Sequence, residues 1–161
     1  MKELNKLIIS VVGGLALLMP STASLAQTFP KVYVYGEADD ADNVSCSATH
    51  KSAVATVQAA LRSNGIEVEY NDAAYPYMSA YVNVTVVKPA NICAVSWEIN
   101  FQNFQSIDDE FLQRPFFTKI VYCDKSGIFT GSASEVYSNL LLSFRDKTNE
   151  CVSSYYEKIK K

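Results

Sequence analysis

The stretch from Asn91 to Phe104 reads N-I-C-A-V-S-W-E-I-N-F-Q-N-F, and the rest of the chain can be arranged around it. Its apolar alternate residues are Cys93, Val95, Trp97, Ile99 and Phe101. The polar residues between them are Ser96, Glu98, Asn100 and Gln102. Because successive side chains of a strand point to opposite faces, this alternation predicts a central strand with one apolar and one polar face. We expect Trp97 to anchor the core.

Other segments show the same two-residue period. Strands are predicted over Lys31–Tyr35, Ile66–Tyr70, Tyr81–Lys88 and Phe116–Asp124. Pro89-Ala90-Asn91 is a turn that predicts a hairpin between Tyr81–Lys88 and the central strand. After a turn at Lys125-Ser126-Gly127, the segment Ile128–Gly131 is either a sixth short strand or a linker.

Two helices are predicted. The first begins after Ser47 or Thr49 and ends at Ser63, before the stop signal Asn64-Gly65. The second begins at a capping box of Ser132 and Glu135 and continues as one helix, or as two halves bent near Asp146–Asn149. Together with the strands, this order predicts an α+β fold of two layers. Its mainly antiparallel sheet of 4–6 strands carries both helices on one face.

Two segments rich in acidic residues are predicted as loops. Glu37–Asn43 is interpreted as a solvated acidic turn, because it lacks the ligand spacing of an EF-hand calcium loop. Gln105–Pro115 contains Asp108, Asp109 and Glu110, and we expect it to be a wide, mobile loop.

The first 26 residues have the layout of a cleaved Sec signal peptide. Lys2 and Lys6 precede an apolar run from Leu7 to Met19, which is shorter than the roughly 20 residues that cross a bilayer. Ser24-Leu25-Ala26 supplies small residues at the cleavage positions. We therefore expect residues 27–161 to form one domain in the periplasm or outside the cell, without stable membrane insertion.

The four cysteines, Cys46, Cys93, Cys123 and Cys151, all follow the predicted cleavage site. An even number in an exported chain predicts two disulfides. Their spacing contains no C-x-x-C pair of the kind found in zinc and redox sites. Of the three possible pairings we favour Cys46–Cys93 with Cys123–Cys151, because each bridge would tie a helix to the sheet. A cross-strand Cys93–Cys123 bridge is the main alternative.

Motifs for catalysis, metal binding and nucleic-acid binding are weak or missing. His50 is the single histidine of the chain, and we interpret it as an exposed residue at a helix start. No glycine-rich loop is followed by the lysine of a P-loop. The formal net charge of −3 argues against sequence-independent binding to nucleic acid. We therefore predict no cofactor, no metal and, in the preferred interpretation, no catalytic site.

The chain is rich in tyrosine, with ten such residues. Tyrosine combines a large apolar ring with a polar tip and is enriched at binding surfaces. Candidate binding residues are these tyrosines near strands and the polar face of the central strand: Tyr33, Tyr35, Tyr75, Tyr77, Tyr81, Glu98, Asn100 and Gln102. The alternative is that the rings merely cover the second face of the sheet.

The preferred interpretation is an exported, disulfide-stabilised, non-catalytic protein-binding domain. An immunity or inhibitor protein, or an accessory protein of the cell envelope, would fit, with another protein of the envelope or outside the cell as the partner. The first alternative is a small-ligand or carbohydrate binder that uses an aromatic patch. The second is a small hydrolase that uses the acidic residues Asp108, Asp109 and Glu110.

Overall fold

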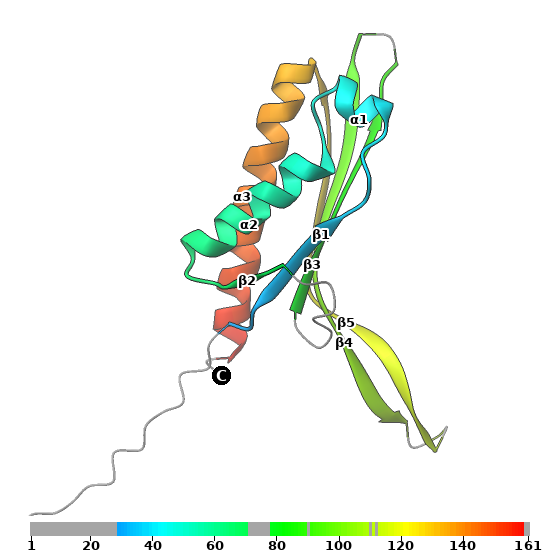
Figure 1. The fold of residues 1–161 in the computed structure, drawn as a ribbon, viewed down its shortest axis with the longest axis vertical. Coiled ribbons are helices and arrows are strands. Elements are labelled where there is room, and N and C mark those ends of the chain that lie inside the picture. The colour runs from blue at the N-terminus through cyan, green and yellow to red at the C-terminus, as the bar shows by residue number, and fades with distance from the viewer. Residues whose placement is uncertain (1–28, 71–77, 90, 110, 112, 160–161) are drawn as a thin grey trace, which may run out of the picture.

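The computed structural model describes residues 29–70, 78–89, 91–109, 111 and 113–159; the predicted signal peptide lies outside them. The elements follow in the order β1 (Val32–Gly36), α1 (Ala41–Ser45), α2 (His50–Ser63), β2 (Val68–Glu69), β3 (Met78–Val87), β4 (Cys93–Asp109), β5 (Arg114–Gly131) and α3 (Ala133–Ile159). Figure 1 shows α2 and α3 lying side by side on one face of the sheet. The predicted two-layer α+β fold is confirmed, with the short α1 as an additional helix.

The five strands of the sheet have the order β2-β1-β3-β4-β5. β1 runs parallel to both β2 and β3, whereas β3, β4 and β5 are antiparallel neighbours. The α1–α2 segment supplies the crossover that a parallel β1–β2 pair requires. The β3–β4 hairpin matches the prediction, and β2 is shorter than the predicted strand Ile66–Tyr70.

The apolar face of β4 forms the centre of the core. The five residues that were predicted to share this face are at most 5% exposed: Cys93, Val95, Trp97, Ile99 and Phe101. The ring of Trp97 meets the ring of Phe144 on α3 edge to face, with centroids 5.3 Å apart. Gly127 on β5 is paired with Trp97, so the indole packs over a position without a side chain. Trp97 is therefore a core residue beneath α3.

The predicted helix ends are confirmed. Thr49 caps α2 by accepting a hydrogen bond from the backbone N–H of Ser52. At the start of α3, Glu135 accepts from the backbone N–H of Ser132, and Ser132 accepts from the backbone N–H of Glu135. α3 is a single helix. The hydroxyl of Thr148, buried in the middle of its apolar stripe, donates to the carbonyl of Phe144 and so needs no outside partner.

The predicted loop Gln105–Pro115 and the predicted turn at Lys125–Gly127 are both wrong. β4 continues to Asp109, and β5 starts at Arg114 and runs through Gly127 without a turn. Asp and Pro are depleted in strands because they fit a covered, fully paired sheet poorly. Here they lie at the far end of an outer hairpin that extends beyond the body of the molecule, where those constraints are weak (Figure 1).

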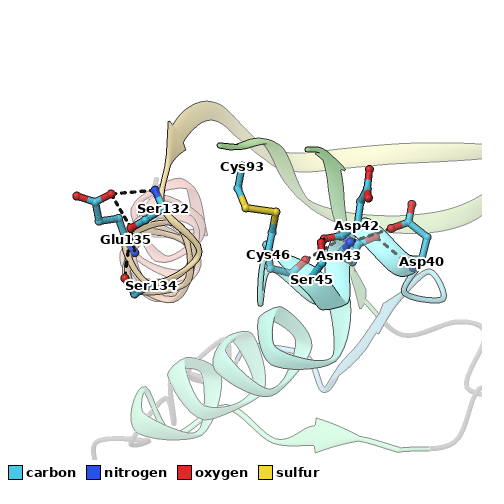
Figure 2. The surroundings of a disulfide bond; sticks show 10 residues. Asp40, Asp42, Asn43, Ser45, Cys46, Cys93, Ser132, Ser134 and Glu135 are labelled. Atoms are coloured by element: carbon cyan, nitrogen blue, oxygen red, sulfur yellow. Dashed lines mark hydrogen bonds between the residues drawn. A yellow bond between two sulfur atoms is a disulfide. The ribbon is translucent and has the colours of Figure 1, made fainter. Parts of the chain in front are cut away.

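Both disulfides join the cysteines of the preferred pairing, Cys46–Cys93 and Cys123–Cys151. The first bridge ties the turn after α1 to the start of β4, close to the capping box of α3 (Figure 2). The second ties β5 to the buried side of α3. Two structural disulfides indicate that the chain folds in an oxidising environment outside the cytoplasm. No helix within the described ranges is long and apolar enough to cross a membrane.

Candidate binding surface

Three of the predicted tyrosines meet on the sheet face opposite α2 and α3. Tyr33 and Tyr35 alternate along β1 with two buried valines, and Tyr81 has the same orientation on β3. The rings of Tyr33 and Tyr35 are nearly parallel, with centroids 5.6 Å apart, and those of Tyr35 and Tyr81 lie 5.3 Å apart. We call these three half-buried residues the tyrosine cluster. Tyr75 and Tyr77 lie outside the described residues.

Hydrogen bonds fix two rings of the tyrosine cluster. The hydroxyl of Tyr81 donates to Glu37 at 2.7 Å, and this bond, with some burial and the nearby negative charge, raises the pKa of Tyr81 to about 12. The hydroxyl of Tyr35 accepts from the amide nitrogen of Gln102 at 2.8 Å. Because both hydroxyls are held, the cluster is ordered before any partner arrives.

The predicted polar face of β4 is only partly exposed. Asn100 and Gln102 are buried, at 7% and 3% exposed, which corrects the expectation that both would face solvent. Asn100 donates to the carboxylate of Glu98, and Gln102 reaches across β3 to Tyr35. β4 lies between β3 and β5, so both of its edges are paired. Of these polar groups, Gln102 supports the tyrosine cluster, through its hydrogen bond to Tyr35.

The outer part of the β4–β5 hairpin, residues 103–109 with 114–121, forms a hairpin arm beyond the end of β3. Its exposed apolar side chains include Ile107, Phe116, Phe117 and Val121, with exposed fractions of 43%, 39%, 62% and 44%. Ile107 is paired with Phe116, and Phe117 is paired with Ser106, so these exposed groups are divided between the two faces of the arm. Exposed aromatic and aliphatic groups are typical of interaction surfaces. The sequence pattern did not indicate these residues, because it predicted a loop for this segment.

The tyrosine cluster and one side of the hairpin arm belong to the same face. Side chains paired across an antiparallel ladder share a face, and Phe104 is paired with Lys119 while Ser106 is paired with Phe117. Phe104 follows Gln102 by two residues and so lies on the same face as that side chain. The rings of Phe104 and Phe117 stack at 5.7 Å. We call the tyrosine cluster together with Phe104 and Phe117 the binding face.

His50 is buried, with an exposed fraction of 4%, so the expectation that it is an exposed residue is wrong. Its Nε2 accepts a hydrogen bond from the backbone N–H of Val84 at 3.1 Å. This nitrogen therefore carries no proton, and Nδ1 donates to Asp39 at 3.0 Å. With both ring nitrogens engaged inside the fold, His50 has a structural role and is not placed for acid–base catalysis.

The acidic segment Glu37–Asn43 is more ordered than the predicted solvated turn. Asp40 caps α1 by accepting from the backbone N–H of Asn43. The amide nitrogen of Asn43 is buried and donates to the carbonyls of Ala48 and Val84. Val84 thus has its N–H bound by His50 and its carbonyl bound by Asn43. These side chains replace a neighbouring strand where β1 has ended at Gly36.

The remaining acidic candidates do not assemble into a site in the described part of the chain. Asp108 lies on the exposed arm, and the side chains of Asp109 and Glu110 lie outside the described residues. Among the described side chains, no group of three or more His, Cys, Asp or Glu residues could hold a metal ion.

A groove of about 820 Å³ separates α2 from α3 on the opposite side of the molecule. Its floor on α2 consists of small side chains such as Ala55 and Ala59, and its α3 wall includes Tyr137, Leu142 and Arg145. The sequence pattern did not predict this groove, since the groove depends on how the two helices pack.

Comparison of the chain with known protein families, with curated proteins and with solved structures found no match.

Proposed function

We propose that this protein is a non-catalytic protein-binding domain of the periplasm or the extracellular space that holds another protein against its binding face. The observation that supports this most is the exposure of Phe117 on the hairpin arm, on the same sheet face as the ordered tyrosine cluster. Aromatic residues dominate the energetically important centres of protein interfaces.

The arrangement favours binding at low entropic cost. A half-buried tyrosine with a fixed hydroxyl loses little rotational freedom when a partner covers it. The hairpin arm extends this surface beyond the body, which suits a partner with a groove or pocket that receives the arm. One disulfide ties the turn after α1 to β4 and the other ties β5 to α3, and both are consistent with a protein that works in an oxidising compartment.

An immunity or inhibitor protein, or an accessory protein of the cell envelope, is the kind of protein that we propose. Both need a small, stable body with one surface committed to a partner, and neither needs a catalytic site. The partner is another protein, and we expect the buried contact to be centred on aromatic side chains with a polar rim.

Retention of proteins from envelope extract and culture medium on the immobilised, oxidised protein tests this proposal. We expect a specific partner that is lost when Phe117 and Tyr33 are both changed to serine. Lys51→Ser on the exposed side of α2 is the matched control and should retain the partner. Retention that survives the Phe117/Tyr33 change but is lost with Leu142→Ser in the α2–α3 groove would contradict the proposal.

A carbohydrate or small-ligand binder is the second candidate. It is favoured by the nearly parallel rings of Tyr33 and Tyr35 with the half-buried carboxylate of Glu98 on the same sheet face, since sugars bind by stacking and hydrogen bonding. Binding to a glycan panel that Tyr35→Ala abolishes, without a retained protein partner, would support this candidate instead of the first.

A further inference from the structure

The outer edge of β5 is a long strand edge at the end of the sheet. The strand order places β5 last, so no strand of the described residues pairs with its outer side from Arg114 to Gly131. Open edges of this length pair readily with another chain, and proteins usually protect them. The protections visible here are local. They are Pro115 near the start of β5 and a bulge at Tyr122, whose carbonyl accepts a hydrogen bond from Lys158 of α3.

The bulge lies between two oppositely charged residues of β5, Lys119 and Asp124. Lys119 precedes the bulge and is paired with Phe104, while Asp124 follows it and is paired with Asn100. Phe104 and Asn100 lie on the same face of β4, so Lys119 and Asp124 also share that face. Both side chains are exposed. Lys119 and Asp124 therefore place a positive and a negative charge on the same face of β5, on either side of the bulge at Tyr122.

We propose that two copies of this chain associate through antiparallel pairing of their β5 edges, with Lys119 of each copy opposite Asp124 of the other. A two-fold axis at the bulge generates both ion pairs at once, because the contact is self-complementary. The bulge itself, where Lys158 already binds the carbonyl of Tyr122, stays outside the new ladder. A second copy of this chain supplies the complementary charges by symmetry, whereas an unrelated protein would carry them in the same positions only by coincidence.

The same register brings exposed apolar groups together. With Lys119 opposite Asp124, Phe117 lies opposite Ser126 of the second copy and diagonal to its Ile128. The exposed fractions of Phe117 and Ile128 are 62% and 79%. Diagonal neighbours on one face are within reach of an aromatic side chain. Each hairpin arm, a two-stranded ribbon in one copy, would gain a third strand from the body of the other, and such ribbons are marginal without one.

This association pairs the backbone edges of two β5 strands and does not require a partner on the binding face, but Phe117 takes part in both contacts. A two-fold axis perpendicular to the sheet leaves the helices of both copies on one side and both tyrosine clusters on the other. The pair would therefore present two binding faces in the same direction, which would favour a partner with repeated sites.

Charge exchange across the two-fold axis tests the register. We expect the oxidised wild-type protein to dimerise in sedimentation equilibrium, and Lys119→Asp or Asp124→Lys to weaken the dimer by at least roughly tenfold, because each creates two like-charge pairs. An equimolar mixture of these two variants should associate again, since every position 119 then faces an opposite charge. Lys51→Asp makes the same charge change on α2 and should leave the dimer unchanged.

Three results would overturn the proposal. The first is a wild-type protein that stays monomeric from micromolar to near-millimolar concentration. The second is a dimer that both single variants leave intact. The third is a mixture of the two variants that stays monomeric while each variant retains the near-ultraviolet circular dichroism of the folded wild type.

Discussion

His50 and Val84 are joined by a hydrogen bond in which the imidazole Nε2 accepts from a backbone N–H of β3 at 3.1 Å. This contact continues the edge of the sheet where β1 has ended, and Asp39 holds the other ring nitrogen at 3.0 Å. It explains why the single histidine of the chain is buried at the start of α2.

His50→Ala should therefore lower the free energy of unfolding by about 2–4 kcal/mol, because it leaves the Val84 N–H and Asp39 without their partner and opens a cavity. Urea denaturation of the oxidised protein measures this. Lys51→Ala, one residue further along α2 and exposed, should change the value by less than about 0.5 kcal/mol. Equal stability of the two variants would show that the contact contributes little.

Gly127→Ala should destabilise the protein by about 1–3 kcal/mol through overpacking. A Cβ at this position would lie 2.8–2.9 Å from atoms of the Trp97 indole, which is itself held against Phe144. Thermal or urea denaturation, with the near-ultraviolet circular dichroism of the tryptophan as a second signal, measures the effect. Ser126→Ala, at the adjacent exposed position, should be close to neutral. A Gly127→Ala variant as stable as wild type would mean that the indole moves at no cost.

The sequence predicted those parts of the fold in which one side of an element is buried. β4 was recognised because α3 covers one of its faces, which requires the alternation of Cys93 to Phe101. The preferred disulfide pairing was chosen because each bridge would tie a helix to the sheet, and both bridges are present.

The hairpin arm and the role of His50 could not be predicted, because neither leaves a local pattern in the sequence. Residues of the arm have no helix over them, so no burial enforces an alternating pattern, and Asp108 with Pro115 resembles a loop. The environment of His50 depends on Val84, which is 34 residues away in the sequence. The sequence indicated all three members of the tyrosine cluster but not their contact, because the parallel pairing of β1 with β3 brings them together.

Removal of each disulfide should lower the free energy of unfolding, and the loss should be larger for the bridge that closes the longer loop. The Cys46–Cys93 bridge spans 47 residues and the Cys123–Cys151 bridge spans 28. The chain-entropy model gives about 4 kcal/mol for the first and about 3.5 kcal/mol for the second. Paired Cys→Ala variants compared by urea denaturation test these values. If the variant that lacks both cysteines of a bridge unfolds at the same urea concentration as the wild type, that bridge has no structural role.

The hydrogen bond between Tyr81 and Glu37 should be visible as a pH effect. It raises the pKa of Tyr81 to about 12, whereas an unfolded tyrosine titrates near 10. Because the native state holds this proton more tightly, the stabilisation is fully present below about pH 10 and is lost as the pH rises through about 12. Tyr81 is only half-buried, so solvent screening reduces its contribution to stability.

Glu37→Gln should lower the pKa of Tyr81 toward 10, because the main cause of the shift, a hydrogen bond to a carboxylate, is replaced by one to a neutral amide. Titration of the tyrosine ring carbons by NMR resolves the individual residues, and Tyr81→Phe assigns the signal. Asp108→Asn, which removes an exposed carboxylate on the distant hairpin arm, is the control and should leave the titration unchanged. If Glu37→Gln and Asp108→Asn give the same titration of Tyr81, Glu37 does not hold this ring of the tyrosine cluster in place.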